Sequence, residues 1–574
     1  MLISCRNIKK SFGDKVVLNG IDLDICRGDR IGLVGRNGAG KSTLAEILTG
    51  NSTADAGTII SSRQRIRVGY LRQAEDAGIF RDVMVNEVDL SGELQRVTSY
   101  LGVRGFSDLQ EEQLGKLSGG EKTKLALAAV WAAQPDLAIL DEPTNHMDYQ
   151  GVEYLIQELQ RFPGAVVIIS HDRFFLDNTV TKIAEIENGT ITIYPGNYSA
   201  FRQAKQQQRE SQWRLYQSQQ KEQRRIDQAI EQLKAWSDKA HRESRQKGGG
   251  RVGGKEYYRK KAKKRDQAIK SQIKRLEKMR QEQVERPAAD PRVKFSVNFA
   301  SQGGRRVIEA EGISKAYGEK ILFTGSSFYI NRGEKVGIFG PNGCGKTTLV
   351  RIILGQEELN EGQLFVSSSA RIAYISQELP QGEKESLLNT IKDWPVDQQK
   401  QVMQLLIALG LSYDRFQVAL GRLSRGERMK IALGLAIWGE NDLLILDEPT
   451  NHLDIYSREA LEESLLQYPG TILLVSHDRY LLDQVCDHML VFEGQQVRRI
   501  EGQLTDYLSK RREYNKTDPA KASAEERLIL ETRMSRVLSE LSLLKPDSPE
   551  YAALDQEYKE LLRQRSMLER GSSS

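Results

Sequence analysis

The sequence contains no long apolar run. None of its stretches approaches the roughly 18 residues that a helix needs to cross a bilayer. The first residues, MLISCRNIKKSFGDK, also lack the sustained apolar segment and small-residue cleavage site of a secretory signal. With 39% hydrophobic and 28% charged residues, the composition is typical of soluble globular domains. We therefore expect a protein with no membrane partner.

Cysteine is scarce as well. The four cysteines, Cys5, Cys26, Cys344 and Cys486, lie far apart and form no CxxC pair or zinc-ligand spacing. This argues against a disulfide scaffold or a structural zinc site. The plain interpretation is a cytoplasmic protein with reduced, mostly buried thiols.

Charge is nearly balanced overall but not locally. The net charge is +5 over 574 residues. Residues 221–280 hold 21 Lys/Arg against 8 Asp/Glu, a balance of +13, so the remaining chain is acidic at −8. This segregation indicates one basic projection on an acidic body rather than general affinity for nucleic acid.

The sequence repeats itself, and the repeat predicts the architecture. GRNGAGKST at 35–43 recurs as GPNGCGKTT at 340–348, LAILDEPTNHMD at 137–148 as LLILDEPTNHLD at 443–454, and SHDRFFLD at 170–177 as SHDRYLLD at 476–483. Strand-like runs such as RIGLVG and AVVIIS alternate with helical patterns in each copy. Two α/β domains with mostly parallel sheets follow.

Each copy contains a P-loop pattern, GxxxxGK[ST], between a strand-like run and an apolar helical stretch. The glycines allow backbone N–H groups to surround phosphates at a helix N-terminus. Lys41 and Lys346 can reach the β- and γ-phosphates, and Ser42 and Thr347 can ligate Mg²⁺. The nucleotide-binding residues predicted in these loops are Gly35, Asn37, Gly38, Gly40, Lys41, Ser42 and Thr43, then Gly340, Asn342, Gly343, Gly345, Lys346, Thr347 and Thr348.

An Asp-Glu pair follows an apolar strand in each copy, Asp141-Glu142 and Asp447-Glu448. The first carboxylate suits the shell of a metal ion, and the second can orient or deprotonate an attacking water. Such a pair alone is more often a solvated loop or a helix cap. Its association with a P-loop in both copies favours a catalytic role.

These motifs resemble the superfamily of ATP-binding-cassette ATPases. LSGGE at 117–121 and LSRGE at 423–427 look like its signature, LDEPTNH like its Walker B segment, and SHD like its switch histidine. The resemblance implies an ATPase with two ATP sites, each between the P-loop of one copy and the signature of the other. It adds the following residues: His171 and His477 at the γ-phosphate, Gln73 and Gln377 at the metal, Phe12 and Tyr317 stacked on adenine, and Ser118, Gly119, Gly120, Glu121, Ser424, Gly426 and Glu427 from the signatures.

One position departs from the superfamily pattern. The second signature carries Arg425 where the first carries Gly119. By resemblance, this signature faces the nucleotide held by Lys41. Equal turnover at the two sites is therefore in doubt.

Two tandem cassettes around a basic insertion resemble the ABC-F family specifically, over residues 1–515. The resemblance implies a protein that binds the ribosome at the tRNA exit site and directs its linker toward the peptidyl-tRNA and large-subunit rRNA. The expected domains are 1–197, 198–300, 301–515 and 516–574. The two cassettes are expected to pair within a monomer.

The linker predicts an antiparallel hairpin of two amphipathic helices, near 198–243 and 256–286. Ile226, Ile230, Leu233, Trp236 and Ala240 recur at helical spacing, as do Ala262, Ile269, Ile273 and Leu276. The first helix would extend ~65 Å, and glycines place a turn in the tip, residues 243–258. Candidate RNA contacts are Arg245, Lys247, Arg251, Lys255, Tyr257, Tyr258, Arg259, Lys260 and Lys261, through phosphate neutralisation and base stacking. The alternative is a solvated hairpin with packed tyrosines.

The tail predicts a second helical hairpin with a coiled-coil seam. The predicted seam residues are Leu530, Met534, Val537, Leu541 and Leu544 before a KPDSPE turn, and Leu554, Tyr558, Leu561 and Leu568 after it. Several functions remain open at this point. A long arm without an added subdomain in the first cassette favours displacement of ribosomal antibiotics over relief of stalled ribosomes. A DNA-binding ATPase acting through the tail and the detached ATPase of an exporter are the alternatives from other classes.

Overall fold

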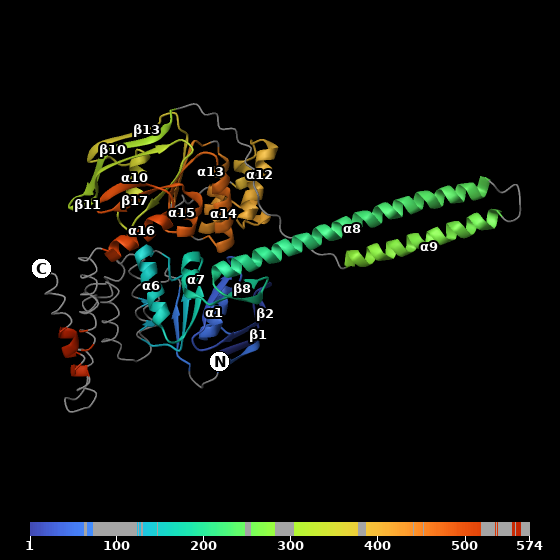
Figure 1. Cartoon of the computed structure of the whole chain (residues 1–574), viewed down its shortest axis with the longest axis horizontal. Helices are drawn as coiled ribbons and strands as arrows, with labels where there is room; N and C mark the ends of the chain where they lie inside the picture. The colour runs from blue at the N-terminus through green and yellow to red at the C-terminus, as the bar shows by residue number, and fades with distance from the viewer. Residues whose placement is uncertain are drawn as a thin grey trace. The chain divides into compact units, whose positions relative to one another are not determined.

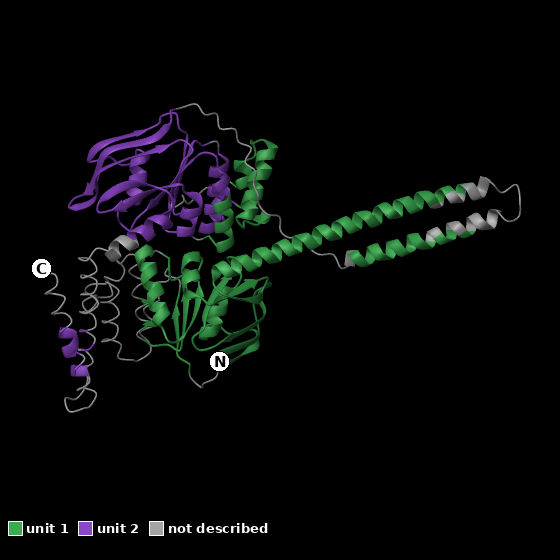
Figure 2. Cartoon of the chain, viewed as in Figure 1, with its two compact units in different colours: residues 1–294, 386–418, 452–463 green, residues 295–385, 419–451, 464–574 purple. Residues whose placement is uncertain are grey.

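The computed structural model describes residues 1–61, 66–72, 133–145, 147–246, 254–281, 304–376, 386–439, 441–451 and 453–517, with scattered residues between 123 and 131 and between 534 and 563 (Figure 1). The chain divides into two compact units. Unit 1 holds residues 1–294, 386–418 and 452–463, and unit 2 holds the remainder (Figure 2). No helix among the described residues combines the length and the apolar character of a membrane span.

Unit 1 contains the first α/β repeat, built on two sheets. The three-stranded antiparallel sheet has the order β2-β1-β4, with β1 Ile3–Phe12, β2 Lys15–Ile25 and β4 Ala56–Ser61. The six-stranded sheet has the order β5-β6-β7-β3-β8-β9. Its strands are β5 Val68–Leu71, β6 Leu137–Asp141, β7 Ala165–Ile169, β3 Arg30–Gly35, β8 Lys182–Glu187 and β9 Thr190–Pro195, of which only β9 is antiparallel to its neighbour.

Successive side chains on the central strands point to opposite faces of the larger sheet, so the unit has one hydrophobic core on each face. On β6, Ile139 faces the core that holds Ile47 of α1 (Lys41–Thr49) and the antiparallel sheet. Leu140 faces the opposite core, with Leu155 of α6 (Tyr149–Arg161) and Phe175 of α7 (Arg173–Thr179). Both faces are thus covered, which explains why LAILD and AVVII are apolar throughout instead of alternating.

Unit 2 repeats this plan. The antiparallel sheet β11-β10-β13 contains β10 Arg306–Tyr317, β11 Lys320–Asn331 and β13 Glu361–Val366. The six-stranded sheet β14-β15-β16-β12-β17-β18 contains β14 Ile372–Ile375, β15 Leu443–Asp447, β16 Thr471–Val475, β12 Lys335–Phe339, β17 His488–Glu493 and β18 Gln496–Glu501. Its helices include α10 Lys346–Ile353, α13 Arg425–Trp438, α15 Arg479–Val485 and α16 Leu504–Thr517, with the short helix η3 Leu420–Arg422. The duplicated α/β architecture predicted from the sequence is confirmed.

The units do not divide where the sequence repeat does. Unit 1 also takes α11 Leu387–Thr390, α12 Val396–Ala408 and η2 Tyr413–Gln417, together with the first part of α14, which spans Ile455–Gln467. Ser457 of α14 donates from its Oγ to the carbonyl oxygen of Leu409, at 2.7 Å, and so joins these segments. Ile455 belongs to the same hydrophobic core as Leu155 and Phe175.

A helical hairpin projects from unit 1 (Figure 1). It consists of α8 (Tyr198–Gln246) and α9 (Gly254–Gln281). At ~1.5 Å per residue, the 49 residues of α8 extend about 73 Å, slightly longer than expected. Ile226, Ile230 and Leu276 are buried between the helices, with Ile269, Ile273 and Met279 packed against them. We call residues 198–281 the arm.

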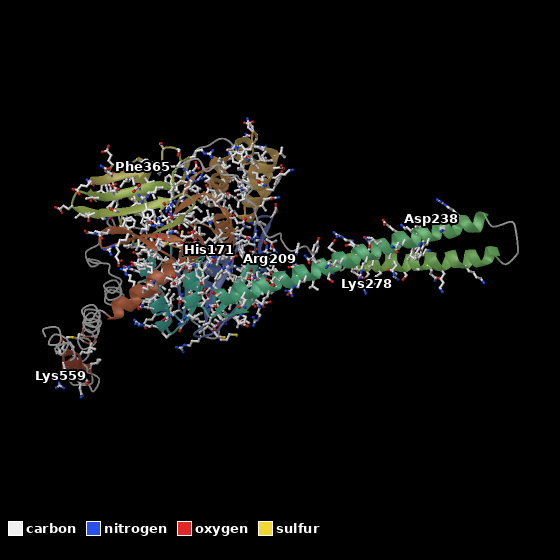
Figure 3. All side chains as sticks on the ribbon, turned by 45° about the horizontal axis from the view of Figure 1, so that its top comes forward. His171, Arg209, Asp238, Lys278, Phe365 and Lys559 are labelled. Carbon is white, nitrogen blue, oxygen red and sulfur yellow. The ribbon has the colours of Figure 1, made fainter. Side chains whose placement is uncertain are left out.

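The predicted seam of the arm is confirmed at Ile226, Ile230, Ile269, Ile273 and Leu276. Leu233 is half-buried outside this cluster, and the side chains of Ala240 and Ala262 lie outside the described part of the structure. Trp236 is an exception. Its side chain is 56% exposed. Two packed helices bury only a narrow stripe, and this stripe is filled by aliphatic side chains at the described positions. Charged side chains such as Arg209 and Asp238 on α8 and Lys278 on α9 project away from the ribbons (Figure 3).

In each repeat, an aspartate side chain accepts hydrogen bonds from the first turn of the helix that follows the last strand. Asp177 accepts hydrogen bonds from Ser199 at the start of α8, from its backbone N at 2.7 Å and its Oγ at 2.6 Å. Asp483 accepts equivalent bonds from the backbone N of Thr505, at 3.0 Å, and from its Oγ1 at the start of α16. The arm and α16 therefore leave their repeats in the same way.

The tail is described only at a few residues. Among them, Met534, Val537 and Leu561 are buried together, with Leu554 and Tyr558 packed against them. All five were expected in the seam of the C-terminal hairpin. The other four residues predicted for this seam, Leu530, Leu541, Leu544 and Leu568, lie outside the described part of the chain.

Candidate nucleotide-binding and hydrolysis site

The two P-loops hold their lysines in the same way. Lys41 Nζ donates to the carbonyl oxygens of Gly35, at 2.8 Å, and Arg36, at 3.1 Å. Lys346 Nζ donates to those of Gly340, at 2.9 Å, and Pro341, at 3.0 Å. Both lysines are buried, and burial lowers the pKa of Lys41. Each ammonium thus lies inside its own loop, where a phosphate group can replace the carbonyl oxygens as its partner.

The glycine before each lysine has a left-handed backbone. Gly40 has φ 101° and Gly345 has φ 106°. A Cβ atom on Gly40 would lie 2.7 Å from side-chain atoms of Val17 and Leu18, so a larger residue would be strained in both backbone and packing. This turn aims the first N–H groups of α1 and α10 into the loop, where they can bind an anion.

A hydroxyl and a carboxylate meet at the end of each P-loop. Thr347 Oγ1 donates to Asp447 Oδ2 at 3.0 Å, and Ser42 is hydrogen-bonded to Asp141. Burial raises the pKa of both aspartates, and these hydrogen bonds partly offset the effect. Hard oxygen donors beside a phosphate-binding loop suit Mg²⁺, which takes few protein ligands in such sites. The residues therefore fit the ion expected from the sequence.

The glutamate directly after each of these aspartates has a strained backbone conformation in both repeats. Glu142 has φ 50° and Glu448 has φ 51°, in the left-handed region that non-glycine residues rarely adopt. The N–H of Glu142 donates to the Ile169 carbonyl at 2.8 Å, and that of Glu448 to the Val475 carbonyl at 2.9 Å. The neighbouring strand thus fixes the backbone of each glutamate and the direction in which its side chain leaves the sheet.

Each glutamate lies beside the predicted switch histidine. Glu142 Oε1 is 3.5 Å from His171 Nε2, and Glu142 Oε2 accepts from the His171 backbone N at 3.4 Å. The corresponding distances for Glu448 and His477 are 3.6 Å and 3.4 Å. Burial raises the pKa of Glu142 to about 7 and that of Glu448 to about 8. A carboxyl group in this range is suited to accept a proton at neutral pH.

The histidines are positioned by the helices that follow them. Asp172 caps α7 by accepting from the Phe175 N–H, and Asp478 caps α15 by accepting from the Leu481 N–H, each at 3.0 Å. These caps fix the chain directly after His171 and His477. The SHD segments expected from the sequence are therefore brought to the Asp-Glu pairs.

Sequence reasoning missed one contact at the first P-loop. The backbone N of Asn37 donates to Asp454 Oδ2 at 3.1 Å, and Asp454 Oδ1 accepts from the Ser457 N–H at 2.8 Å as the cap of α14. Asp454 is the last residue of the repeated block LDEPTNHLD, which is the signal that could have found it. Arg458, one turn later, opposes the effect of burial on the pKa of Glu142.

The second signature begins α13 with a capping box. Ser424 Oγ accepts from the Glu427 N–H at 3.2 Å, and Glu427 Oε2 accepts from the Ser424 N–H at 2.8 Å. Arg425 is the first helical residue. The first signature, with Ser118, Gly119, Gly120 and Glu121, and the glutamines Gln73 and Gln377 lie outside the described residues.

The aromatic residues expected at adenine end the first strand of each repeat. Phe12 and Tyr317 are 54% and 48% exposed. Lys10 Nζ lies 5.7 Å from the centroid of the Phe12 ring, and Lys315 Nζ lies 5.0 Å from that of Tyr317. An exposed ring with a neighbouring ammonium group can stack on a nucleotide base.

The arm-tip residues fall at the facing ends of two helices. Arg245 lies in the last turn of α8, and Lys255, Tyr257 and Tyr258 lie in the first turns of α9. Arg259, Lys260 and Lys261 follow in α9, and Lys260 is exposed. Lys247 and Arg251 lie outside the described residues.

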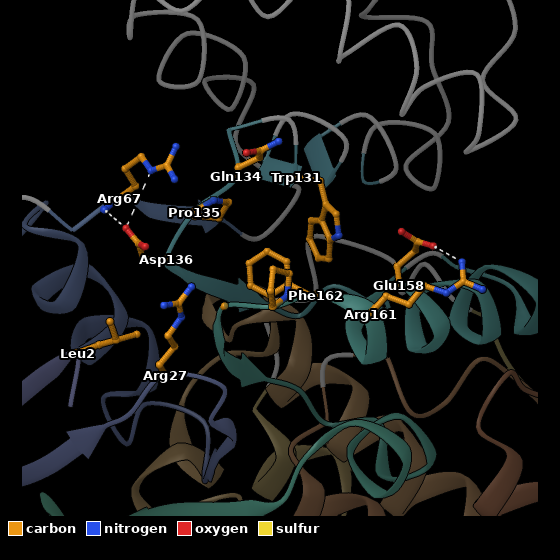
Figure 4. A pocket seen from close by; sticks show the side chains of 12 residues that line it. Leu2, Arg27, Arg67, Trp131, Gln134, Pro135, Asp136, Glu158, Arg161 and Phe162 are labelled. Carbon is orange, nitrogen blue, oxygen red and sulfur yellow. Dashed lines mark hydrogen bonds and ion pairs between the residues drawn. The ribbon is translucent and has the colours of Figure 1, made fainter. Parts of the chain in front are cut away.

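A separate pocket of about 450 Å³ lies in unit 1 near the start of β6 and the end of α6 (Figure 4). Its lining is mixed, with apolar side chains such as Trp131 and Phe162 beside charged ones such as Arg27 and Asp136. The Arg161–Glu158 ion pair, at 3.5 Å, lies on its rim. None of the residues predicted for nucleotide binding lines this pocket.

Comparison with known proteins supports the assignment made from these sites. Residues 18–145 and 323–451 match the family described as "ABC transporter", and residues 184–248 match a further family with the same description. The chain is 40% identical to the "Ribosome protection protein VmlR" of Bacillus subtilis (strain 168), over 98% of this chain and 97% of that protein. It is 30% identical to "ABC transporter F family member 5" of Arabidopsis thaliana, over 88% and 77%.

A further relative is the "Energy-dependent translational throttle protein EttA" of Mycobacterium tuberculosis (strain ATCC 25618 / H37Rv), 30% identical over 86% of this chain and 91% of that protein. Among solved structures, "RNase-L Inhibitor" aligns with a TM-score of 0.58 and 19% identity, over 88% of this chain and 92% of that one. This likeness concerns the fold. The tandem P-loop cassettes and the end-to-end relatives together show that the chain is an ATP-binding ATPase and belongs to the ABC-F family.

Proposed function

We propose that this chain is an ATP-gated ribosome-binding factor that protects the large subunit from antibiotics. The observation that carries the proposal is its 40% identity, over nearly the full length of both chains, to a protein named for ribosome protection. The basic arm on a P-loop cassette supports it, because Lys and Arg neutralise RNA phosphates. The partners are large-subunit rRNA and peptidyl-tRNA in the cytoplasm, and the protein acts as a monomer.

The proposed chemistry is in-line hydrolysis of the γ-phosphate at two sites. Lys41 and Lys346 hold the β- and γ-phosphates, and Phe12 and Tyr317 stack on adenine. Ser42 with Asp141, and Thr347 with Asp447, hold Mg²⁺, which neutralises charge on the phosphates when bound. Gln73 and Gln377 belong to the same metal shells.

Within this proposal, Glu142 and Glu448 accept the proton of the attacking water. His171 and His477, 3.5 Å and 3.6 Å from these carboxyl groups, contact the γ-phosphate. The signature residues of one cassette, such as Ser424 and Glu427, complete the site of the other. ATP binding closes the cassettes, and hydrolysis reopens them and releases the ribosome.

The two glutamates predict a pH dependence of ATP turnover. The base must be ionised, so activity is lost as pH falls through its pKa, which burial raises to about 7 for Glu142 and about 8 for Glu448. We expect kcat to fall about tenfold or more from pH 8 to pH 6. The measurement is steady-state phosphate release at saturating ATP and Mg²⁺. A flat profile over this range would show that neither carboxyl group limits the reaction as a base.

Resistance can be tested directly. We expect expression in a susceptible host to raise the inhibitory concentration several-fold for at least one class among lincosamides, pleuromutilins, streptogramins, macrolides and phenicols. The matched control is Lys41→Ala with Lys346→Ala, expressed to the same level. Unchanged susceptibility to every class would exclude antibiotic protection and favour the second candidate, a translation factor that relieves stalled ribosomes. The throttle protein among its relatives motivates that alternative.

A further inference from the structure

The first part of α14 is joined to the root of the arm by two polar contacts, one through a buried tyrosine and one through a half-exposed arginine. Tyr198, the first residue of α8, donates from its hydroxyl to Glu459 Oε1 at 2.9 Å and is only 2% exposed. Arg202, one turn further along α8, places its Nε 3.4 Å from the same carboxylate oxygen. Glu459 therefore binds two successive turns of the arm.

The same helix face makes two further contacts with unit 1. Tyr456 donates from its hydroxyl to Glu185 of β8, whose other oxygen lies 2.9 Å from Lys205 Nζ on the arm. Glu462 forms an ion pair with Arg173 of α7 at 2.7 Å, with the two side chains 5% and 1% exposed. Residues three positions apart share one face of a helix, so Tyr456, Glu459 and Glu462 form a continuous row. We call this row the α14 seam.

The N-terminal end of this helix contacts the nucleotide loop. Asp454 caps α14 and accepts from the Asn37 N–H in the P-loop of Lys41. The guanidinium group of Arg36 lies 5.9 Å from the centroid of the Tyr456 ring. A short, rigid helical segment thus contacts the P-loop at its start and the arm about one turn later.

The α14 seam is only partly repeated between the two copies, since Glu459 and Arg173 recur as Glu153 and Arg479 while the other positions differ. The positions 306 residues before Tyr456 and Glu462 hold Gln150 and Ile156, and those 306 residues after Glu185 and Tyr198 hold Val491 and Leu504. General cassette packing would call for similar residues in both copies, as Glu459 and Arg173 show. The two tyrosines whose hydroxyls bind Glu185 and Glu459 instead occur where α8 begins, and their equivalents are Gln150 and Leu504.

We propose that Tyr456 and Glu459 are positioning residues that set the direction of the arm according to the nucleotide state of the P-loop at Lys41. The proposed function explains why such a movement of the arm would be useful, but the movement itself does not depend on ribosome binding. Because α8 is continuous for 49 residues, a tilt of about 5° at its root would move its far end by about 6 Å. Small changes at Asp454 are therefore amplified at the tip.

The test measures arm movement without ribosomes. Spin labels are placed at Lys15→Cys, on β2, and Asp238→Cys, on the exposed face of α8, in a Cys26→Ser background. The distance between them is measured by pulsed electron resonance with and without ATP, in chains that also carry Glu142→Gln and Glu448→Gln to prevent turnover. We expect ATP to shift the distance by several ångströms, and we expect Glu459→Gln with Tyr198→Phe to abolish most of that shift.

Controls separate positioning from folding. Tyr198→Phe removes one hydroxyl group, and Arg202→Gln alters a half-exposed side chain, so each can be tested alone if the double variant unfolds early. The matched control is Glu153→Gln, at the position equivalent to Glu459 in the first repeat, which should keep the full shift. With the native glutamates restored, the variants at Tyr198, Arg202 and Glu459 should keep basal ATP turnover within about twofold, because the contacts described for these three side chains join α8 to α14 and not to the P-loop.

Two results would overturn the inference. One is an ATP-dependent shift in the seam variants equal to that of the parent, and the other is no shift in the parent itself. Absence of ribosome binding would instead remove the proposed function and leave this inference standing, because the measurement uses the isolated chain.

Discussion

A chain with Glu142→Gln and Glu448→Gln is expected to hydrolyse ATP at least about a hundredfold more slowly than the native chain, because general-base catalysis contributes about 10²–10⁴ to such rates. Glutamine keeps the size of the side chain and cannot accept the proton. ATP binding should survive, since Lys41 and Lys346 are unchanged. The double variant should therefore remain closed on ATP and accumulate on ribosomes, which sedimentation through sucrose can measure.

The controls follow from the two-site arrangement. Adding Lys41→Ala and Lys346→Ala should abolish accumulation, because closure requires bound nucleotide. The single glutamate variants measure how far each site contributes. The two sites differ, because Arg425 replaces glycine in one signature and because Arg458 lowers the pKa of Glu142 but is not among the charges that shift the pKa of Glu448. If the double variant binds ATP but stays in the ribosome-free fraction, the ribosomal proposal is wrong.

Shortening the tip of the arm is expected to have the second largest effect. A chain in which residues 243–258 are replaced by a short turn should lose antibiotic protection completely. Its basal ATP turnover should stay close to that of the native chain, because the buried contacts of the arm that are described, Ile226, Ile230 and Leu276 among them, lie outside the deletion. Inhibitory concentrations in the host and phosphate release by the purified chain measure the two properties separately.

A milder variant tests the proposed chemistry of the tip. Tyr257→Ala with Tyr258→Ala should weaken protection if the rings stack on bases, since each stacked base is worth about 1–3 kcal/mol. Deletion of residues 517–574 serves as the matched control. Protection that survives loss of the tip but disappears with the tail would point to nucleic-acid binding through the C-terminal hairpin.

Repetition and periodicity made much of the architecture predictable. The recurrence of GRNGAGKST and LDEPTNH fixed two α/β cassettes, because strand, loop and helix must follow in that order around a P-loop. The apolar spacing of Ile226, Ile230, Leu276 and their neighbours identified the arm. Trp236 fitted the same spacing but is exposed, because spacing alone does not say how wide a stripe the partner helix covers.

Contacts between distant parts of the chain were not predictable in the same way. Arg173 and Glu462 are 289 residues apart, and Tyr198 and Glu459 are 261 apart. Arg173 lies in the repeated block SHDRFFLD, but no motif or periodic pattern in the sequence pairs it with Glu462 or pairs Tyr198 with Glu459. The left-handed backbone of Glu142 and Glu448 was also hidden, because it depends on a hydrogen bond to a neighbouring strand rather than on local propensity.

The aspartates that start α8 and α16 have a consequence for how such chains diversify. In both cassettes the chain leaves through a helix whose start is hydrogen-bonded to an aspartate, Asp177 in one and Asp483 in the other. A helical extension of different length can follow this start without a change in the sheets. In this chain the first of these helices is α8, with 49 residues, and the second is α16, with 14 residues. The length of these helical extensions can therefore change while the ATP-binding cassettes stay the same.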